Sequence, residues 1–273
     1  MPTRRNEHVY VYAVVSGRPS ARVLSRLPTL PDGSIPRSIA LDDEMCLVVA
    51  DVPSAIYNAE ALEPKLADLE WVSRCGAAHH AVADALVESH VVLPFRFFTL
   101  FSSDAVATAT LRKAKARLAK ALARVKGRQE WVLRIGKPDP ARRPTPPARH
   151  ARPDQPDRPD RPDQLDPNSG TGFLHAKASA RRQETERNAR IAGDAAAAFE
   201  ILRGMSDETA ARPIPPGTTL LLDAAFLVPK RRTVALQRAL ADAAASLLRE
   251  GCPVSLTGPW PPYSFASLDK NHG

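Results

Sequence analysis

Histidines, cysteines and carboxylates are the side chains of this 273-residue chain that could hold a metal or carry catalysis. His79 and His80 are adjacent in a helical pattern, so their side chains point about 100° apart and cannot hold one metal together. Neither His90 nor His175 has a nearby carboxylate at the spacing of metal ligands. We therefore predict no metal site and expect histidines on helix surfaces or in hydrogen-bonded core positions.

The cysteines and acidic residues also lack catalytic spacing. Cys46, Cys75 and Cys252 are an odd set without CxxC or CxxH spacing, which argues against a disulfide framework and a zinc site. Glu184 and Glu186 lie too close in sequence to share one face of a helix. The nucleophile elbow, the P-loop, the dinucleotide-binding glycine motif and HExxH are all missing. We predict no catalytic residue and no cofactor, so the chain is expected not to be an enzyme.

An aromatic, proline-rich run, LTGPWPPYSF, occupies residues 256–265. Prolines at 259, 261 and 262 keep Trp260 out of a helix and fix an extended arm at low entropic cost. In one interpretation the arm is an internal clamp, with Trp260 buried and its N–H bonded to a carbonyl. In the other it is a docking peptide with an exposed tryptophan. We favour the clamp, because the arm continues a predicted strand and an exposed aromatic run would promote aggregation.

Arg96 is the charged residue whose position most needs an explanation. In a strand, period-two alternation places it on the same face as Pro94 and Phe98. A guanidinium on a half-apolar strand needs a partner, so we expect an internal ion pair with a helix carboxylate. The alternative is contact with another chain at an exposed sheet edge.

The bulk composition fits a globular protein of the cytoplasm. The chain is 44% apolar and 25% charged, its N-terminal apolar run is too short for a signal peptide, and no window reaches ~18 uninterrupted apolar residues. A net charge of +8 would suit nucleic acid, but the basic patches at 112–120 and 229–232 contain no aromatic residue for base stacking. We expect no membrane insertion and no specific nucleic acid, and keep a basic nucleic-acid-binding module as an alternative.

A segment rich in proline, arginine and aspartate divides the chain into two globular parts. Residues 137–169 contain almost no bulky apolar side chain, and RPD recurs at 152–154, 158–160 and 161–163. Such a sequence buries too little surface to offset its ordering entropy, which predicts a disordered, polyproline-like spacer. A PxxP ligand for a partner domain is the open alternative. The predicted domains are therefore 1–136 and 170–273.

Strand and helix patterns in both domains predict an α+β fold. The first domain reads as strands at 8–15, 45–52, 91–101 and 129–135, one or two helices over 59–89 with a break near Gly76, and a helix from Ser102 or Ser103 to Gly127. The second reads as a long helix over 172–205, a strand at 218–228, a helix at 230–250 and a strand at 253–258. We expect two small sandwich domains, each a mostly antiparallel sheet with helices on one face.

Several of these segments resemble the gas vesicle protein GvpL/GvpF family. Residues 79–106 look like the family's helix, histidine-containing turn and VLPLRFGT-like strand, with Phe98 standing where a glycine is usual. The second domain is similar to the family at 172–181, at AAFLVP (224–229) and at the ending LTGPWPPYSF (256–265). The RPD spacer looks like an insertion relative to the family pattern. The resemblance covers both predicted domains.

The resemblance implies a non-enzymatic minor gas vesicle protein that acts in vesicle assembly. Its implied partners are the small hydrophobic shell protein and other gas vesicle accessory proteins, and its implied location is the cytoplasm, in association with gas vesicles. The rival functions are the nucleic-acid-binding module and an enzyme with no recognisable site. The expected partner-binding or structural signature residues are Pro94, Arg96, Phe97, Trp260, Pro261, Pro262, Tyr263 and Phe265.

Overall fold

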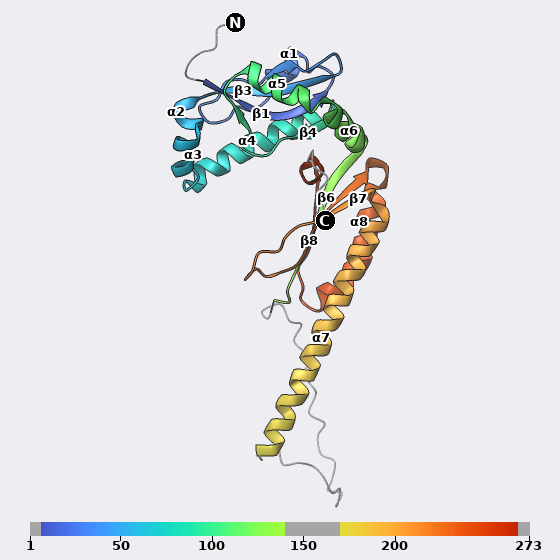
Figure 1. Ribbon diagram of the computed structural model, residues 1–273. Coiled ribbons are helices and arrows are strands. Elements are labelled where there is room, and N and C mark those ends of the chain that lie inside the picture. Colours follow the sequence, from blue (N-terminus) through green and yellow to red (C-terminus); the bar gives the residue numbers. More distant parts are fainter. Residues whose placement is uncertain (1–6, 140–169, 267–273) are drawn as a thin grey trace, which may run out of the picture.

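The computed structural model describes residues 7–139 and 170–266, with the side chains of the second range from residue 174 onward. The predicted spacer, 137–169, lies almost entirely outside the described residues. Two antiparallel sheets form the molecule, one above the other in Figure 1, each with its own helices. The predicted α+β class is thereby confirmed.

The elements of the first half are β1 (Glu7–Ser16), α1 (Ala21–Leu24), β2 (Arg37–Ala40), β3 (Met45–Pro53), α2 (Ser54–Tyr57), α3 (Ala59–Lys65), α4 (Leu69–Val87), β4 (Val92–Pro94), β5 (Leu100–Phe101), α5 (Asp104–Lys113) and α6 (Lys115–Val125). Those of the second half are β6 (Arg128–Gly136), α7 (Gly170–Met205), β7 (Glu208–Ala211), β8 (Leu220–Pro229), α8 (Thr233–Arg249) and β9 (Val254–Trp260), with single 3-10 turns at Lys230–Arg232 and Tyr263–Phe265.

The first sheet carries helices on both faces, whereas one covered face was expected. Its strand order is β2-β3-β1-β4, and β5 also pairs with β1. Tyr10 and Tyr12 of β1 pack in the core under α4, while Val9 and Val11 pack in a second core with α5 and α6. Because successive side chains of a strand point to opposite faces, the continuous apolar run of β1 fits a strand that is buried on both sides.

The helical stretch after β3 breaks near residue 67, not at Gly76 as predicted. Asp68 caps α4, since its carboxylate accepts hydrogen bonds from the backbone N–H groups of Glu70 and Trp71 at 3.1 and 3.0 Å. Such a cap satisfies N–H groups that have no partner within the helix. Gly76 lies inside α4, where no heavy atom would meet an added Cβ within 4 Å.

The predicted strand 91–101 is interrupted by a turn. β4 and β5 both pair with β1, but between them Thr99 donates its N–H and its hydroxyl to the Arg96 carbonyl, at 3.2 and 2.7 Å. Phe98 takes a left-handed conformation with φ of 60°. Its ring stacks on Trp71, 5.7 Å between centroids and 7° between planes. Phenylalanine thus adopts the backbone geometry that glycine would adopt more readily.

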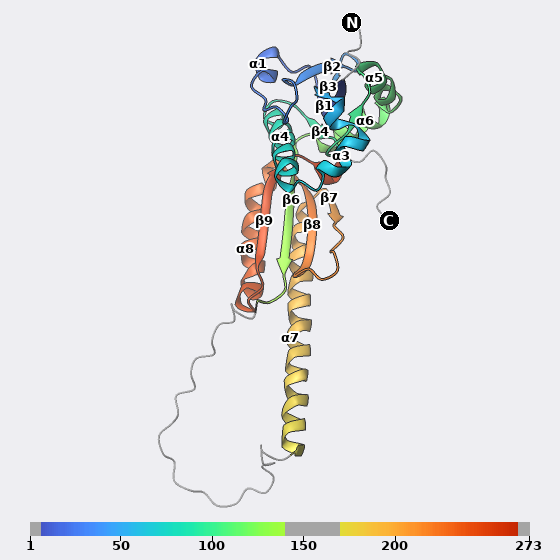
Figure 2. The ribbon, with the colours of Figure 1, turned by 90° about the vertical axis from the view of Figure 1, so that its left-hand side faces the viewer.

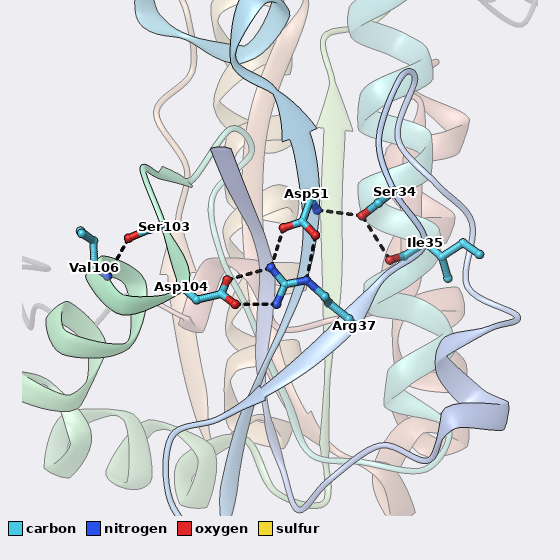
Figure 3. A network of polar contacts seen from close by, with 7 residues as sticks. All are labelled: Ser34, Ile35, Arg37, Asp51, Ser103, Asp104 and Val106. Carbon is cyan, nitrogen blue, oxygen red and sulfur yellow. Dashed lines mark hydrogen bonds and ion pairs between the residues drawn. The ribbon is translucent and has the colours of Figure 1, made fainter. Parts of the chain in front are cut away.

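An arginine on edge strand β2 ties three elements together (Figure 3). The Arg37 guanidinium donates to Asp51 of β3 at 3.0 and 2.5 Å and to Asp104 of α5 at 2.9 and 2.7 Å. Asp104 follows Ser103, whose side chain accepts from the Val106 N–H and so caps the helix as predicted. The two carboxylates raise the pKa of Arg37.

The strand at 128–136 belongs to the second sheet, which corrects its expected place in the first domain. The strand order there is β7-β8-β6-β9, and β6 pairs along its length with both β8 and β9. Helices α7 and α8 lie on one face of this sheet (Figures 1 and 2). Trp131, Leu133 and Ile135 face that side and pack in its core, which explains why β6 pairs where it does.

Helix α7 packs only through its C-terminal half. Ile191, Ala198 and Leu202 are buried against the second sheet and α8. The side chains of residues 174–186 are all exposed, and Figure 1 shows this part of the helix extending away from the sheets. Among the described residues, no helix is both long and apolar enough to cross a lipid bilayer.

Replacing Phe98 tests the strain in the turn at 95–99. Phe98→Gly and Phe98→Ala both remove the ring, but only glycine accepts a positive φ without a steric penalty. We expect Phe98→Ala to be about 1 kcal/mol less stable than Phe98→Gly in urea unfolding. Equal stability of the two variants would contradict a strained backbone at this position.

Candidate functional site

The C-terminal arm folds back into the junction between the two sheets. After β9 ends at Trp260, Pro261 and Pro262 are buried and the chain makes its 3-10 turn. Phe265 is buried among residues of the second sheet and the end of α6, while Ala266 packs against the core of the first sheet. The arm therefore contacts both halves of the molecule, which Figure 1 shows in red between them.

A buried carboxylate on β6 holds the arm. Glu130 is 1% exposed. Its carboxylate accepts from the Ser264 N–H at 2.7 Å, the Ser264 hydroxyl at 2.8 Å and Arg212 at 3.0 Å. Arg212 also donates to the Ser264 hydroxyl at 2.9 Å. Burial raises the pKa of Glu130, while the bonds from Ser264 and the charge of Arg212 act in the opposite direction.

The first half of the molecule adds its own contacts to the arm. Arg124, near the end of α6, donates a hydrogen bond to the Phe265 carbonyl. The rings of His79 and His80 on α4 lie 6.1 and 6.0 Å from the Tyr263 ring. Tyr263 is thus enclosed between α4 and the second sheet, and desolvation raises its pKa above the ordinary value.

His79 and His80 both lie beside Tyr263 but differ in their other contacts. His79 is buried, and its Nδ1 lies 2.7 Å from the Tyr10 hydroxyl. Burial disfavours the imidazolium ion and lowers the pKa of His79 to about 4. The His80 ring lies 4.9 Å from the Trp260 ring. Within the described ranges, no three histidine, cysteine or acidic residues form a group that could hold a metal ion.

The expectation for Trp260 is wrong. Its side chain is 37% exposed, and its indole N–H donates to the Thr257 hydroxyl at 3.2 Å, not to a carbonyl. Trp260 ends an edge strand, so no further strand covers its outer side. The buried part of the arm consists of Pro261, Pro262 and Phe265 instead.

The expectation of an internal ion pair for Arg96 is also wrong. Its side chain is exposed and forms no ion pair with any described residue. The period-two argument fails because the chain turns here and does not remain a strand. Pro94 is buried beside β1, and the Phe97 ring lies 5.8 Å from His79. Phe97 and Tyr263, from the two signature segments, therefore meet at His79.

The residues that fix the arm were missed from the sequence. Arg212 belongs to no recognisable motif, Ser264 is the polar residue between Tyr263 and Phe265 of the arm, and both lie far from Glu130 along the chain. One signal was available at Glu130. It is an acidic residue inside the apolar strand QEWVLRI, where a carboxylate without a partner would be costly to bury.

Solved structures share this architecture of two sheets. The crystal structure of the gas vesicle protein GvpF from Anabaena matches with a TM-score of 0.66 and 16% identity, covering 98% of this chain and 99% of that one. The GvpF structure from Microcystis aeruginosa matches with a TM-score of 0.60 and 16% identity, covering 95% and 99%. The fold is therefore that of the GvpF proteins of known structure.

Sequence comparison gives the family. The gas vesicle synthesis protein GvpL/GvpF family matches residues 8–267. Gas vesicle protein L of a Streptomyces species is 31% identical over 95% of this chain and 92% of its own length. Gas vesicle protein L2 of Halobacterium salinarum is 28% identical over 94% and 90%. The chain belongs to the GvpL/GvpF family, as the resemblance predicted, and this membership supports a role in gas vesicles.

Removing the Glu130 carboxylate should release the arm. In Glu130→Ala, Arg212 loses a buried partner and Ser264 loses two bonds, so we expect a loss of about 3 kcal/mol in urea unfolding. Glu200→Ala is the matched control, because its pair with Arg203 is exposed on α7 and contributes at most about 0.5 kcal/mol. Similar losses in both variants would show that Glu130 is no anchor.

The buried histidine should make stability depend on pH. An unfolded chain takes up the His79 proton near pH 6.5, but the folded protein only near pH 4. Stability is thus fully present above pH 6.5 and falls as the pH drops, by about 2 kcal/mol at pH 5. His79→Asn should flatten this fall in unfolding free energy, whereas His175→Asn, on the exposed part of α7, should not. An unchanged pH slope in His79→Asn would refute the assignment.

Proposed function

We propose that this chain is a non-enzymatic minor gas vesicle protein that acts in vesicle assembly by binding the shell protein and other accessory proteins. We place it in the cytoplasm, in association with gas vesicles. The observation that carries the proposal is a family match over nearly the whole chain. The relatives that match over nine tenths or more of both lengths are named gas vesicle proteins.

The positions and hydrogen bonds of the titratable groups support a non-enzymatic role. Tyr10, His79 and Glu130, whose pKa values are shifted by burial, are packed in the interior and engaged in internal hydrogen bonds. Shifted pKa values also occur in structural networks of hydrogen bonds and ion pairs, such as the one that Glu130 forms with Arg212 and Ser264. Their contacts here stabilise the junction between the sheets.

The basic patches do not favour a nucleic-acid function. In the patch at 112–120, Arg112 donates to the Leu41 carbonyl and Lys115 pairs with Asp42 at 2.9 Å. In the patch at 229–232, Arg232 donates to the Met205 carbonyl. Cations engaged in the fold are less available for phosphate contacts, so we propose no second function.

Exposed Arg96 gives a test at one of the signature residues. When the chain and the shell protein are coexpressed, wild type should recover the shell protein in a pull-down, and Arg96→Glu should recover less without loss of stability. Arg231→Glu, an exposed arginine in the turn after β8, is the matched control and should behave as wild type. Equal recovery by both variants would remove Arg96 from the interface. Failure of wild type to recover any gas vesicle protein would refute the proposed function.

A further inference from the structure

A pocket of about 190 Å³ lies beside the arm, between α4 and the face of the second sheet that α7 and α8 leave uncovered. Its lining includes His80, Arg134, Arg212, Thr257, Trp260 and Tyr263. This volume corresponds to about six water molecules at ~30 Å³ each, which is room for one amino-acid side chain. The buried contacts of the arm with Glu130 form one wall of the pocket.

The cationic members of two ion pairs face this pocket. The Arg134 side chain is 48% exposed, whereas that of its partner Asp223 is 12% exposed. The Arg212 side chain is 31% exposed, and that of its partner Glu130 only 1%. Glu130 also lines the pocket, but its carboxylate oxygens already accept hydrogen bonds from Ser264 and Arg212, so the groups left for a ligand are guanidinium groups. The charge of the pocket is complementary to an anion.

Arg134 keeps donors free for such an anion. Its Nε binds Asp223 at 3.2 Å, and neither Nη group bonds to any described residue. A guanidinium whose two Nη groups are free can grip a carboxylate with two parallel hydrogen bonds. Arg212, in contrast, donates to Glu130 and Ser264 through its Nη2 and is committed to the arm.

Trp260 offers an apolar surface next to these cations. Its indole N–H is already satisfied by Thr257, so the exposed part of the side chain is the ring itself. The residue ends β9, which is an edge strand of the second sheet. An edge strand presents unpaired backbone groups to which an extended peptide can add as a further strand. Figure 2 shows β9 at the margin of the sheet, beside β6.

We propose that this pocket binds an extended segment of a partner protein through a carboxylate side chain. The carboxylate pairs with the Nη groups of Arg134, a neighbouring apolar side chain covers the Trp260 ring, and the peptide backbone runs along β9. The inference rests on the proposed function only for the statement that the partner is a gas vesicle protein. The recognition chemistry follows from the pocket.

The test uses the full chain and a fluorescent peptide of the repeat glutamate-threonine-valine-threonine, with glutamine in place of glutamate as the uncharged counterpart. Alternate side chains of an extended peptide share one face, so one glutamate can enter the pocket while the valine two positions away reaches the Trp260 ring. At low salt, wild type should bind the glutamate peptide at least about tenfold more tightly, as expected for one charge-assisted pair. Equal affinity for the two peptides would overturn the proposal.

Variants locate the binding site. Arg134→Gln should abolish the preference for glutamate, and Trp260→Ala should weaken both peptides. Arg238→Gln is the control, because this arginine is exposed on α8 and its replacement changes the net charge equally. An equal loss of binding in Arg238→Gln would reduce the effect to net charge and overturn the proposal. Binding of a single-stranded oligonucleotide to wild type but not to Arg134→Gln would also overturn the proposal, because the pocket would then recognise nucleic acid.

The pull-down with the coexpressed shell and accessory proteins separates this inference from the proposed function. If wild type and Arg134→Gln recover gas vesicle proteins equally, the proposed function stands and the pocket loses its assigned role. If wild type recovers no gas vesicle protein, the proposed function fails. The preference for the glutamate peptide over the glutamine peptide then remains as the test of how the pocket recognises a ligand. A loss of recovery limited to Arg134→Gln and Trp260→Ala supports both.

Discussion

The junction between the two sheets depends on one buried carboxylate. A carboxylate as deep as that of Glu130 is costly to bury unless it is hydrogen-bonded and paired. Its partners come from the arm and from the segment after β7, through Ser264 and Arg212. The requirement to satisfy this carboxylate therefore fixes where the last described residues lie. Once Ser264 is in place, Tyr263 lies beside α4, and Phe265 packs against the second sheet and the end of α6.

The path of the chain makes the two halves interdependent. The chain enters the second sheet at β6, which precedes the segment at 140–169, and α7, which follows that segment, packs against the same sheet. The arm then returns to the first half, where Phe97 and Tyr263 both lie beside His79. Two of the segments that carry the family resemblance, 79–106 and 256–265, thus meet at one place. Their residues hold the halves together, and Arg96 and the Trp260 ring remain exposed.

Local patterns in the sequence predicted most elements, because apolar runs and helical periodicity act over short distances. They gave β1, β3, α7, α8 and the Ser103 cap. They could not predict which sheet β6 joins, because β6 pairs with strands that follow it by about 80 residues or more. The turn at Phe98 depends on its stacking against Trp71, and Glu130 finds its partner Ser264 134 residues away along the chain. Both outcomes are set by tertiary contacts.

Amide hydrogen exchange at Ser264 tests the central claim most directly. The Ser264 N–H donates to the buried Glu130 carboxylate, so it should exchange only when the junction opens. The account predicts protection of Ser264 comparable to that of Val132 in β6, and a large loss of that protection in Glu130→Gln. Exchange of Ser264 in the wild-type protein as fast as that of a freely exposed amide would contradict it, because the arm would then be open in the native state.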